Sequence, residues 1–183
     1  MSLHDDSRRV LLDWQAPDSE QEALRALFLE HLAAREDATS RGCHPDHLTA
    51  SALVFSHDQR QVALTLHAKL GRWLQTGGHC EPDDARLVAA ACREAREESG
   101  VSALRMDAVP VLLSRHEVRC GPLRPAHHLD VQFVAVADRD AVLAVSEEST
   151  DVRWFAVDDL PADADHSVRA LVIAGARRLR ESP

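Results

Sequence analysis

Apolar residues recur at intervals of three and four near both ends of the chain, which predicts an amphipathic helix in each place. The first predicted helix covers residues 19–36, and Ser19 followed by Glu22 has the pattern of a capping box at its start. The second closes the chain in a basic run, while the residues before position 19 predict an irregular lead-in. The apolar positions are Leu24, Leu27, Phe28 and Leu32 in the first helix, and Val168, Leu171, Val172 and Leu179 in the second.

Between these helices, short apolar runs predict β-strands over residues 48–55, 61–67, 108–116, 128–136 and 152–157. A short polar segment separates the first two runs, which is typical of a hairpin. Strands outnumber helices, and the helix predicted inside the chain separates two groups of strands. This order predicts an α/β fold in which helices cover both faces of a mixed sheet.

The predicted strand over residues 128–136 has one polar face. One face carries the apolar residues Leu129, Val131 and Phe133. The opposite face carries His128, Asp130 and Gln132. A polar face is unusual for an internal strand, so we expect His128 and Asp130 to border a substrate pocket. Trp73 is a further candidate for substrate contact, because an indole ring stacks well on a nucleotide base. Packing or structural hydrogen bonding is the competing interpretation for each of these residues.

The composition narrows the classes of function. A chain of 183 residues suits one domain and is long enough to bury a core. The net charge of −9 argues against sequence-independent binding of nucleic acid, which rests on clustered cations. No apolar run approaches the roughly 18 residues of a membrane span and no signal peptide is recognisable, so we expect a cytoplasmic protein. The four cysteines lie far apart, which favours reduced thiols.

Residues 77–101 carry the strongest functional pattern. Two consecutive glycines precede a helix predicted over residues 84–99, on which Glu94, Glu97 and Glu98 share one face. A diglycine lets the backbone approach a ligand closely, and clustered carboxylates offer the hard oxygen ligands that Mg²⁺ prefers. The competing interpretation is a solvated helix face stabilised by ion pairs. The flanking glycines favour a site for a metal ion and a diphosphate.

Gly78 and residues 93–101 resemble the Nudix box, G-x5-E-x7-R-E-U-x-E-E-x-G-U, in which U is aliphatic. The second half matches at each fixed position, with Ala95 as the small apolar residue. The first half departs from the motif, because the expected glutamate falls on Asp84 and eight residues separate it from the arginine. We therefore leave open whether Asp84 or Asp83 caps the helix or takes the place of the missing glutamate.

The flanking segments also fit the Nudix family. Residues 73–78 resemble its usual lead-in to the box, and residues 152–161 resemble its late strand and turn. The resemblance implies an α/β/α sandwich with a mixed sheet, here with an added N-terminal helix. We expect residues 1–44 to form a helical extension and residues 45–183 to form the Nudix-like domain, within a single domain overall.

The resemblance also implies a reaction, the hydrolysis of a nucleoside diphosphate linked to another group X. Glu94, Glu97 and Glu98 would hold Mg²⁺, or Mn²⁺ in its place. The backbone carbonyl of Gly77 or Gly78 would assist them. Such an ion polarises the diphosphate and lowers the pKa of a bound water.

Two further roles follow from the same resemblance. Arg93 would orient the glutamates through ion pairs. The general base varies among members of the family, so it stays open here. Glu97 or Glu98 can serve, and so can Glu147 or Glu148 in the loop before the late strand, where related enzymes often place another acid.

Other functions compete with this one. A Nudix fold that binds a nucleotide without hydrolysis is the main alternative, although a pure binder has no need of three mutually repelling glutamates. Isopentenyl-diphosphate isomerase has a similar fold, but it uses a catalytic cysteine and a histidine-rich metal site that the local sequence does not reproduce. The expected partner is a small nucleotide rather than nucleic acid or a membrane. A homodimer that pairs through the N-terminal helix is compatible with the resemblance.

Zinc is a further alternative, because thiolate and imidazole suit that ion. Histidines and cysteines stand close together at several points of the chain, but none of these groups has a paired CxxC framework. We therefore do not predict a structural zinc site. The groups are His79 with Cys80, His116 with Cys120, and Cys43 with His44 and His47.

Overall fold

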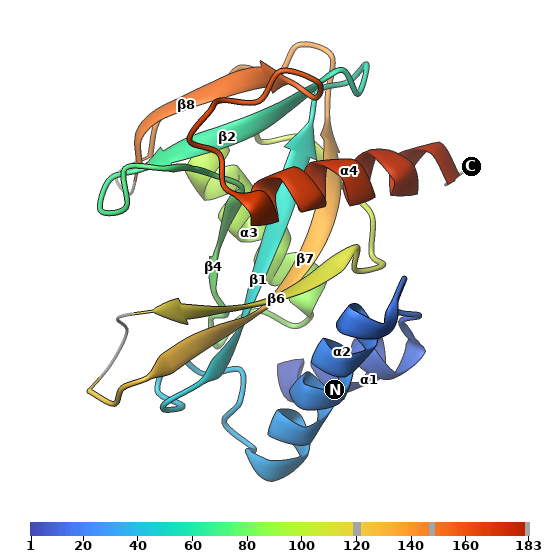
Figure 1. Cartoon of the computed structure of the whole chain (residues 1–183), viewed down its shortest axis with the longest axis vertical. Coiled ribbons are helices and arrows are strands. Elements are labelled where there is room, and N and C mark those ends of the chain that lie inside the picture. Colours follow the sequence, from blue (N-terminus) through green and yellow to red (C-terminus); the bar gives the residue numbers. More distant parts are fainter. Residues whose placement is uncertain (119–121, 147–148, 182–183) are drawn as a thin grey trace.

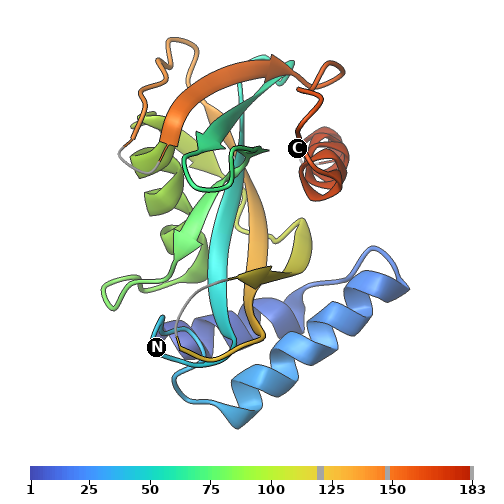
Figure 2. The same cartoon turned by 60° about the vertical axis from the view of Figure 1, so that its left-hand side comes forward.

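Residues 1–118, 122–146 and 149–181 are described by a computed structural model, and they form four helices and eight strands. The strands make one curled sheet with helices on both of its faces (Figures 1 and 2). In chain order the elements are α1 (Leu3–Asp13), α2 (Ser19–Ala34), β1 (His47–Phe55), β2 (Gln61–His67), β3 (Trp73–Leu74), β4 (Thr76–His79), α3 (Leu87–Ser99), β5 (Leu104–Met106), β6 (Leu112–Val118), β7 (Ala126–Ala137), β8 (Ser149–Ala156) and α4 (His166–Glu181).

Strands β1 and β7 run parallel through the middle of the sheet. Their first halves are flanked by β4 and β6, and their second halves by β2 and β5, all in antiparallel pairing. The register sets His47 beside His128 and Thr49 beside Asp130. The predicted hairpin of β1 and β2 and the mixed sheet are confirmed.

Alternate residues of β1 enter two separate cores. Leu48 and Ala50 belong to the cluster that includes the apolar face of α3, whereas Leu53 and Phe55 belong to the cluster that includes α4. Each residue of β1 is buried, because helices cover both faces of this strand. Figure 2 shows α3 and α4 on opposite sides of the sheet. The predicted α/β/α sandwich is therefore confirmed.

The chain starts with two helices rather than one. The sequence predicts an irregular lead-in, but α1 covers that segment and starts at a capping box formed by Ser2 and Asp5. Its 11 residues are mostly polar, so the apolar pattern there is too short to stand out. The cap of α2 also differs from the prediction. Asp18 is the N-cap and accepts a hydrogen bond from the Gln21 backbone, so the capping box predicted at Ser19 is wrong.

The strand predicted over residues 108–116 is displaced. The structure has β5 before this range, and β6 starts at Leu112 and continues to Val118. Pro110 has no N–H to donate to a neighbouring strand, and the Asp107 carboxylate accepts the Val109 N–H at 2.9 Å in a local turn. These two features keep residues 108–110 out of the strands, whereas the N–H groups of Asp107 and Val111 on either side still donate to carbonyls of β7.

Within the described part of the chain, no helix has both the length and the apolar composition needed to cross a lipid bilayer. Cys43, Cys80 and Cys92 are free thiols. Burial raises the pKa of Cys43 to about 11 and that of Cys80 to about 12. Both thiols are therefore protonated at neutral pH, which makes them poor nucleophiles.

Candidate active site

Helix α3, which carries the acidic cluster, starts at Leu87 rather than at Asp84. Arg86 is its N-cap and provides no side-chain hydrogen bond. The cap comes from another element, because the buried carboxylate of Asp6 in α1 accepts the Leu87 N–H at 3.0 Å. An anion at this position also interacts favourably with the helix dipole. The alternative that Asp83 or Asp84 caps the helix is therefore wrong.

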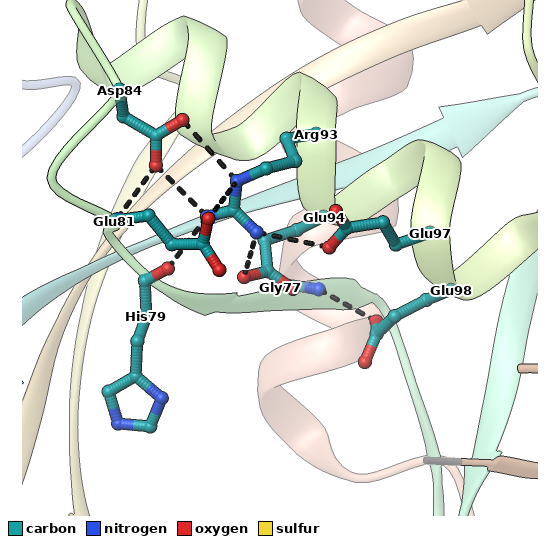
Figure 3. A network of polar contacts seen from close by, with 8 residues as sticks. All are labelled: Gly77, His79, Glu81, Asp84, Arg93, Glu94, Glu97 and Glu98. Carbon is teal, nitrogen blue, oxygen red and sulfur yellow. Dashed lines mark hydrogen bonds and ion pairs between the residues drawn. The ribbon is translucent and has the colours of Figure 1, made fainter. Parts of the chain in front are cut away.

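Arg93 occupies the centre of the site (Figure 3). One terminal nitrogen donates to the Asp84 carboxylate and to the His79 backbone carbonyl, both at 2.9 Å. The other donates to Glu94 at 2.9 Å and to Glu97 at 3.0 Å. Burial alone would lower the pKa of Arg93, but the hydrogen bonds to Asp84 and Glu94 raise it well above its usual range. The guanidinium is therefore charged at any pH at which the protein folds.

The diglycine lies against the glutamates of α3. Glu98 is only 8% exposed and accepts the Gly77 N–H at 2.9 Å. A Cβ atom added to Gly78 would stand 2.8 Å from the Glu94 carboxylate, and one added to Gly77 would overlap with Ser51. Gly77 therefore requires glycine, whereas a side chain at Gly78 would have to displace the Glu94 carboxylate. The same absence of side chains leaves the backbone of β4 close to the acidic face of α3.

The donor set of this site fits a hard divalent cation. Carboxylates and backbone carbonyls are the ligands that Mg²⁺ takes, with water and substrate phosphate to complete its shell. Glu94 and Glu98 are largely buried, whereas the Glu97 side chain is 58% exposed. Arg93 already binds one oxygen of Glu94 and one of Glu97, so a cation must share or replace these contacts.

Asp130 and Trp73, the sequence-predicted substrate residues, are both buried. Asp130 is 3% exposed, and its carboxylate accepts hydrogen bonds from the Thr49 and Ser51 hydroxyls at 3.0 and 2.7 Å. Trp73 is 8% exposed and packs edge-on against Phe155, with ring centroids 4.8 Å apart. Their contact with substrate stays a prediction, and in the structure both residues support the fold.

His128 belongs to a group of histidines that are distant from one another in the sequence. Among the described residues, His47, His79 and His128 form a group of three. The atoms with which they could bind a metal ion lie within 4.8 Å of one another. The group has no local pattern, because its members do not neighbour one another along the chain. The group could be found only from the parallel register of β1 and β7, which pairs His47 with His128. The sequence alone does not show that these two strands are neighbours.

Glu147 and Glu148, the further candidates for the general base, lie outside the described residues. Two hollows of about 300 and 730 Å³ occur where β1 and β7 end, and neither is lined by Arg93 or by the glutamates of α3. The hollows therefore do not mark the acidic site. The first is lined in part by Ser56, Asp58, Gln61 and Trp154, and the second by residues 100–103 and 138–142.

The chain matches the model of one protein family, the NUDIX domain, over residues 45–174. A comparison with curated proteins finds no match. Among solved structures, the chain is similar to a NUDIX-family hydrolase from Clostridium perfringens, with 23% identity, a TM-score of 0.58, and coverage of 74% of this chain and 98% of that one.

Two other solved structures show the same fold. The Ap4A hydrolase of C. elegans, in a binary complex, has 16% identity and a TM-score of 0.62, with coverage of 74% of this chain and 98% of that one. The NUDIX domain of Shewanella oneidensis NrtR, complexed with ADP ribose, has 20% identity and a TM-score of 0.55, with coverage of 82% and 97%.

The family match covers more than half of the chain and includes α3, the diglycine and both central strands. It agrees with the box resemblance in the sequence and with the α/β/α sandwich in the structure. The chain therefore belongs to the NUDIX domain family, as a hydrolase of the Nudix pyrophosphohydrolase type.

Proposed function

We propose that this protein hydrolyses the diphosphate linkage of a nucleoside diphosphate joined to a group X, with Mg²⁺ or Mn²⁺ as cofactor. The observation that carries the proposal is the packing of Glu94 and Glu98 of α3 against the diglycine, with Arg93 bonded to Glu94 and to Glu97. A solvated helix face would not need a buried Glu98 bonded to the backbone of the neighbouring strand. The arrangement suits a cation that is coordinated by protein carboxylates and also by substrate phosphate.

The residues have separate roles in this proposal. Glu94, Glu97 and Glu98 hold the ion, together with the backbone carbonyl of Gly77 or Gly78. When bound, the ion polarises the diphosphate and makes a bound water more acidic. Arg93 donates hydrogen bonds to Glu94 and Glu97 and so limits the positions that these carboxylates can take. Hydrogen bonds from residues outside the coordination shell usually orient metal ligands in this way.

The general base remains open between Glu97, Glu98, Glu147 and Glu148. A base must come within hydrogen-bond reach of the attacking water in the substrate complex. Glu97 has the accessibility for that role, because more than half of its side chain is exposed. Glu98 is buried and already bonded to Gly77, which suits a ligand better than a proton acceptor.

The nature of X is not fixed by the box. Solved relatives include a protein named as an Ap4A hydrolase and a domain complexed with ADP ribose, so both chemistries belong in a substrate panel. Trp73, His128 and Asp130 remain the proposed contacts to the substrate. The proposed partner is a small nucleotide and not nucleic acid, in keeping with the net charge of −9. We also propose a cytoplasmic location and a homodimer.

The activity is tested with a panel of ADP-ribose, nucleoside triphosphates, dinucleoside polyphosphates and nucleotide sugars, each with Mg²⁺ and with Mn²⁺. We expect release of a nucleoside monophosphate from at least one class. In Glu98→Gln the activity should fall by at least about tenfold, because a ligand is lost while the acceptor for the Gly77 N–H is kept. Glu30→Gln, at an exposed position on α2, is the matched control and should leave the rate unchanged.

Two results would argue against the proposal. Undiminished turnover in Glu98→Gln would remove the metal assignment. Inactivity of the wild-type protein on the whole panel, together with calorimetric binding of a nucleotide, would favour the non-catalytic module. The isomerase alternative requires a catalytic cysteine that reaches its substrate, and Cys80 is buried.

A further inference from the structure

Three imidazoles from three adjacent strands meet on one face of the sheet. His47 lies on β1, His128 beside it on β7, and His79 on β4 at the other side of β1. The ring centroids of His47 and His128 are 4.9 Å apart, and each lies 4.9 to 5.1 Å from that of His79. One nitrogen of each ring lies within 4.8 Å of the other two. The residues come from distant parts of the sequence, so the fold brings them together.

Two of these rings direct an unpartnered nitrogen into the protein. Nδ1 of His47 lies 3.1 Å from the Cys43 backbone carbonyl, which can only accept, so this nitrogen carries the hydrogen and Nε2 holds a lone pair. Nε2 of His47 and Nε2 of His128 are buried and have no hydrogen-bond partner among the described residues. A buried polar atom without a partner destabilises the fold, because it has lost its hydrogen bonds to water. A ligand bound by both nitrogens would remove this destabilisation at the two sites together.

We propose that His47, His79 and His128 bind one divalent transition-metal ion of the Zn²⁺ class. Imidazole nitrogen suits Zn²⁺, Co²⁺ and Ni²⁺, whereas Mg²⁺ prefers oxygen. At metal–nitrogen distances of about 2.0–2.1 Å, tetrahedral ligands stand about 3.3 Å apart, so modest ring rotations bring these nitrogens to ligand distance. The Nδ1–H bond of His47 to a backbone carbonyl is the outer contact that zinc-binding histidines usually make.

The environment keeps the rings in the form that binds a metal. Burial lowers the pKa of His128 to about 3, and the neighbouring imidazoles lower it further than burial alone would. Burial likewise lowers the pKa of His79 to about 4, with His47 as the next cause. Neutral imidazole is the ligand form, so no proton has to leave these rings at neutral pH.

This site is separate from the acidic one but adjoins it along β4. Gly77 and Gly78 contact the glutamates of α3, and His79 follows directly. In Figure 3 the His79 ring points away from the Arg93 network, while its backbone carbonyl accepts from Arg93. Three histidines leave a fourth position for water or a substrate oxygen. The exposed His116 lies beside the group, with its ring centroid 5.4 Å from that of His128.

Co²⁺ titration of the full-length, untagged protein tests the proposal, with excess Mg²⁺ present to fill the acidic site. We expect visible absorption bands typical of a nitrogen-ligated Co²⁺ ion, saturating at about one ion per chain, and loss of the bands on adding Zn²⁺. In His128→Gln and in His79→Gln, the Kd for Co²⁺ should rise at least about tenfold. Fluorescence melting of each variant in chelator verifies that it folds.

Two controls separate this site from its surroundings. His127→Gln changes the neighbouring histidine, which bonds to Asp46 instead, and should bind Co²⁺ as the wild type does. The double variant Glu94→Gln/Glu98→Gln should also keep the Co²⁺ bands, even though it loses any Mg²⁺-dependent hydrolysis. The proposal is overturned if the wild type gives no bands, or if folded His128→Gln and His79→Gln bind Co²⁺ like the wild type. Loss of the bands in the glutamate variant alone would assign the ion to α3.

Discussion

The position of Asp84 explains why the first half of the Nudix box departs from the motif. Because α3 starts at Leu87, Asp84 lies in the preceding loop, where it accepts the Glu81 N–H at 2.8 Å and reaches Arg93 at 2.9 Å. A loop can absorb an extra residue that a helix cannot, since only the helix fixes the spacing of its side chains. The shorter acid thus still contacts the arginine. The expected pair between Arg93 and Glu97 is present as well.

Gly78 lies directly against the Glu94 carboxylate. Gly78→Ala should reduce hydrolysis of the best substrate by about a hundredfold, because its Cβ would stand 2.8 Å from the Glu94 carboxylate and displace it. Gly42→Ala is the control, since an added Cβ there meets its nearest atom at 3.4 Å. Steady-state kinetics with varied Mn²⁺ measures the effect. Equal activity of Gly78→Ala and the wild type would show that the position of Glu94 does not matter.

Helix α1 supplies the cap at the N-terminus of α3. Asp6 is 1% exposed and is bonded both to Arg9 at 2.6 Å and to the first N–H of α3. The first N–H groups of a helix have no partner within the helix, and here Arg86 offers none from its own side chain. The N-terminal extension is therefore part of the structure that holds the glutamates in position.

Asp6→Ala should lower the free energy of unfolding by about 1–3 kcal/mol, because it leaves the buried Leu87 N–H without an acceptor. Asp6→Asn keeps a side-chain oxygen and should lose less. Asp13→Ala, at the exposed end of the same helix, serves as control. Urea unfolding measures all three variants. If Asp6→Ala is as stable as Asp13→Ala, the bond to α3 contributes nothing.

Local patterns in the sequence were sufficient for α2, α4 and the hairpin, because their apolar spacing is long and regular. They were insufficient for α1, whose packing depends on an interaction with Leu87 far along the chain. The acidic cluster on α3 follows from helical spacing alone, so the sequence identified it. The histidine group depends on strand register, and the contact of Asp84 depends on a loop conformation. Neither has a local signature.

At the scale of the whole molecule, the N-terminal residues share a core with the family domain. Trp14, Phe28 and Leu32 lie in the same buried cluster as Leu48 and Leu129 of the central strands. Residues 1–44 precede the matched range, but their helices α1 and α2 lie at one end of the sheet (Figure 2). We expect the extension and the domain to unfold together.

Tryptophan fluorescence tests this expectation, because the chain has one tryptophan in the extension and two in the domain. One variant keeps Trp14 through Trp73→Phe and Trp154→Phe. The other keeps Trp73 through Trp14→Phe and Trp154→Phe. Urea transitions of each variant, followed by its tryptophan and by circular dichroism, should coincide, as in a two-state domain. A Trp14 signal that changes at lower urea than the circular dichroism would show that the extension is a separate unit.

The parallel pairing of β1 and β7 has a consequence for how the protein forms. Thr49 bonds to Asp130, and Asp6 bonds to Leu87, each across 81 residues of chain. Contacts this distant in sequence form slowly, because a long loop must close first. On the ribosome, the apolar β1 emerges well before its parallel neighbour is made. We therefore expect α3 to form its turns early, while the surroundings that orient its glutamates arise only in the last step of folding.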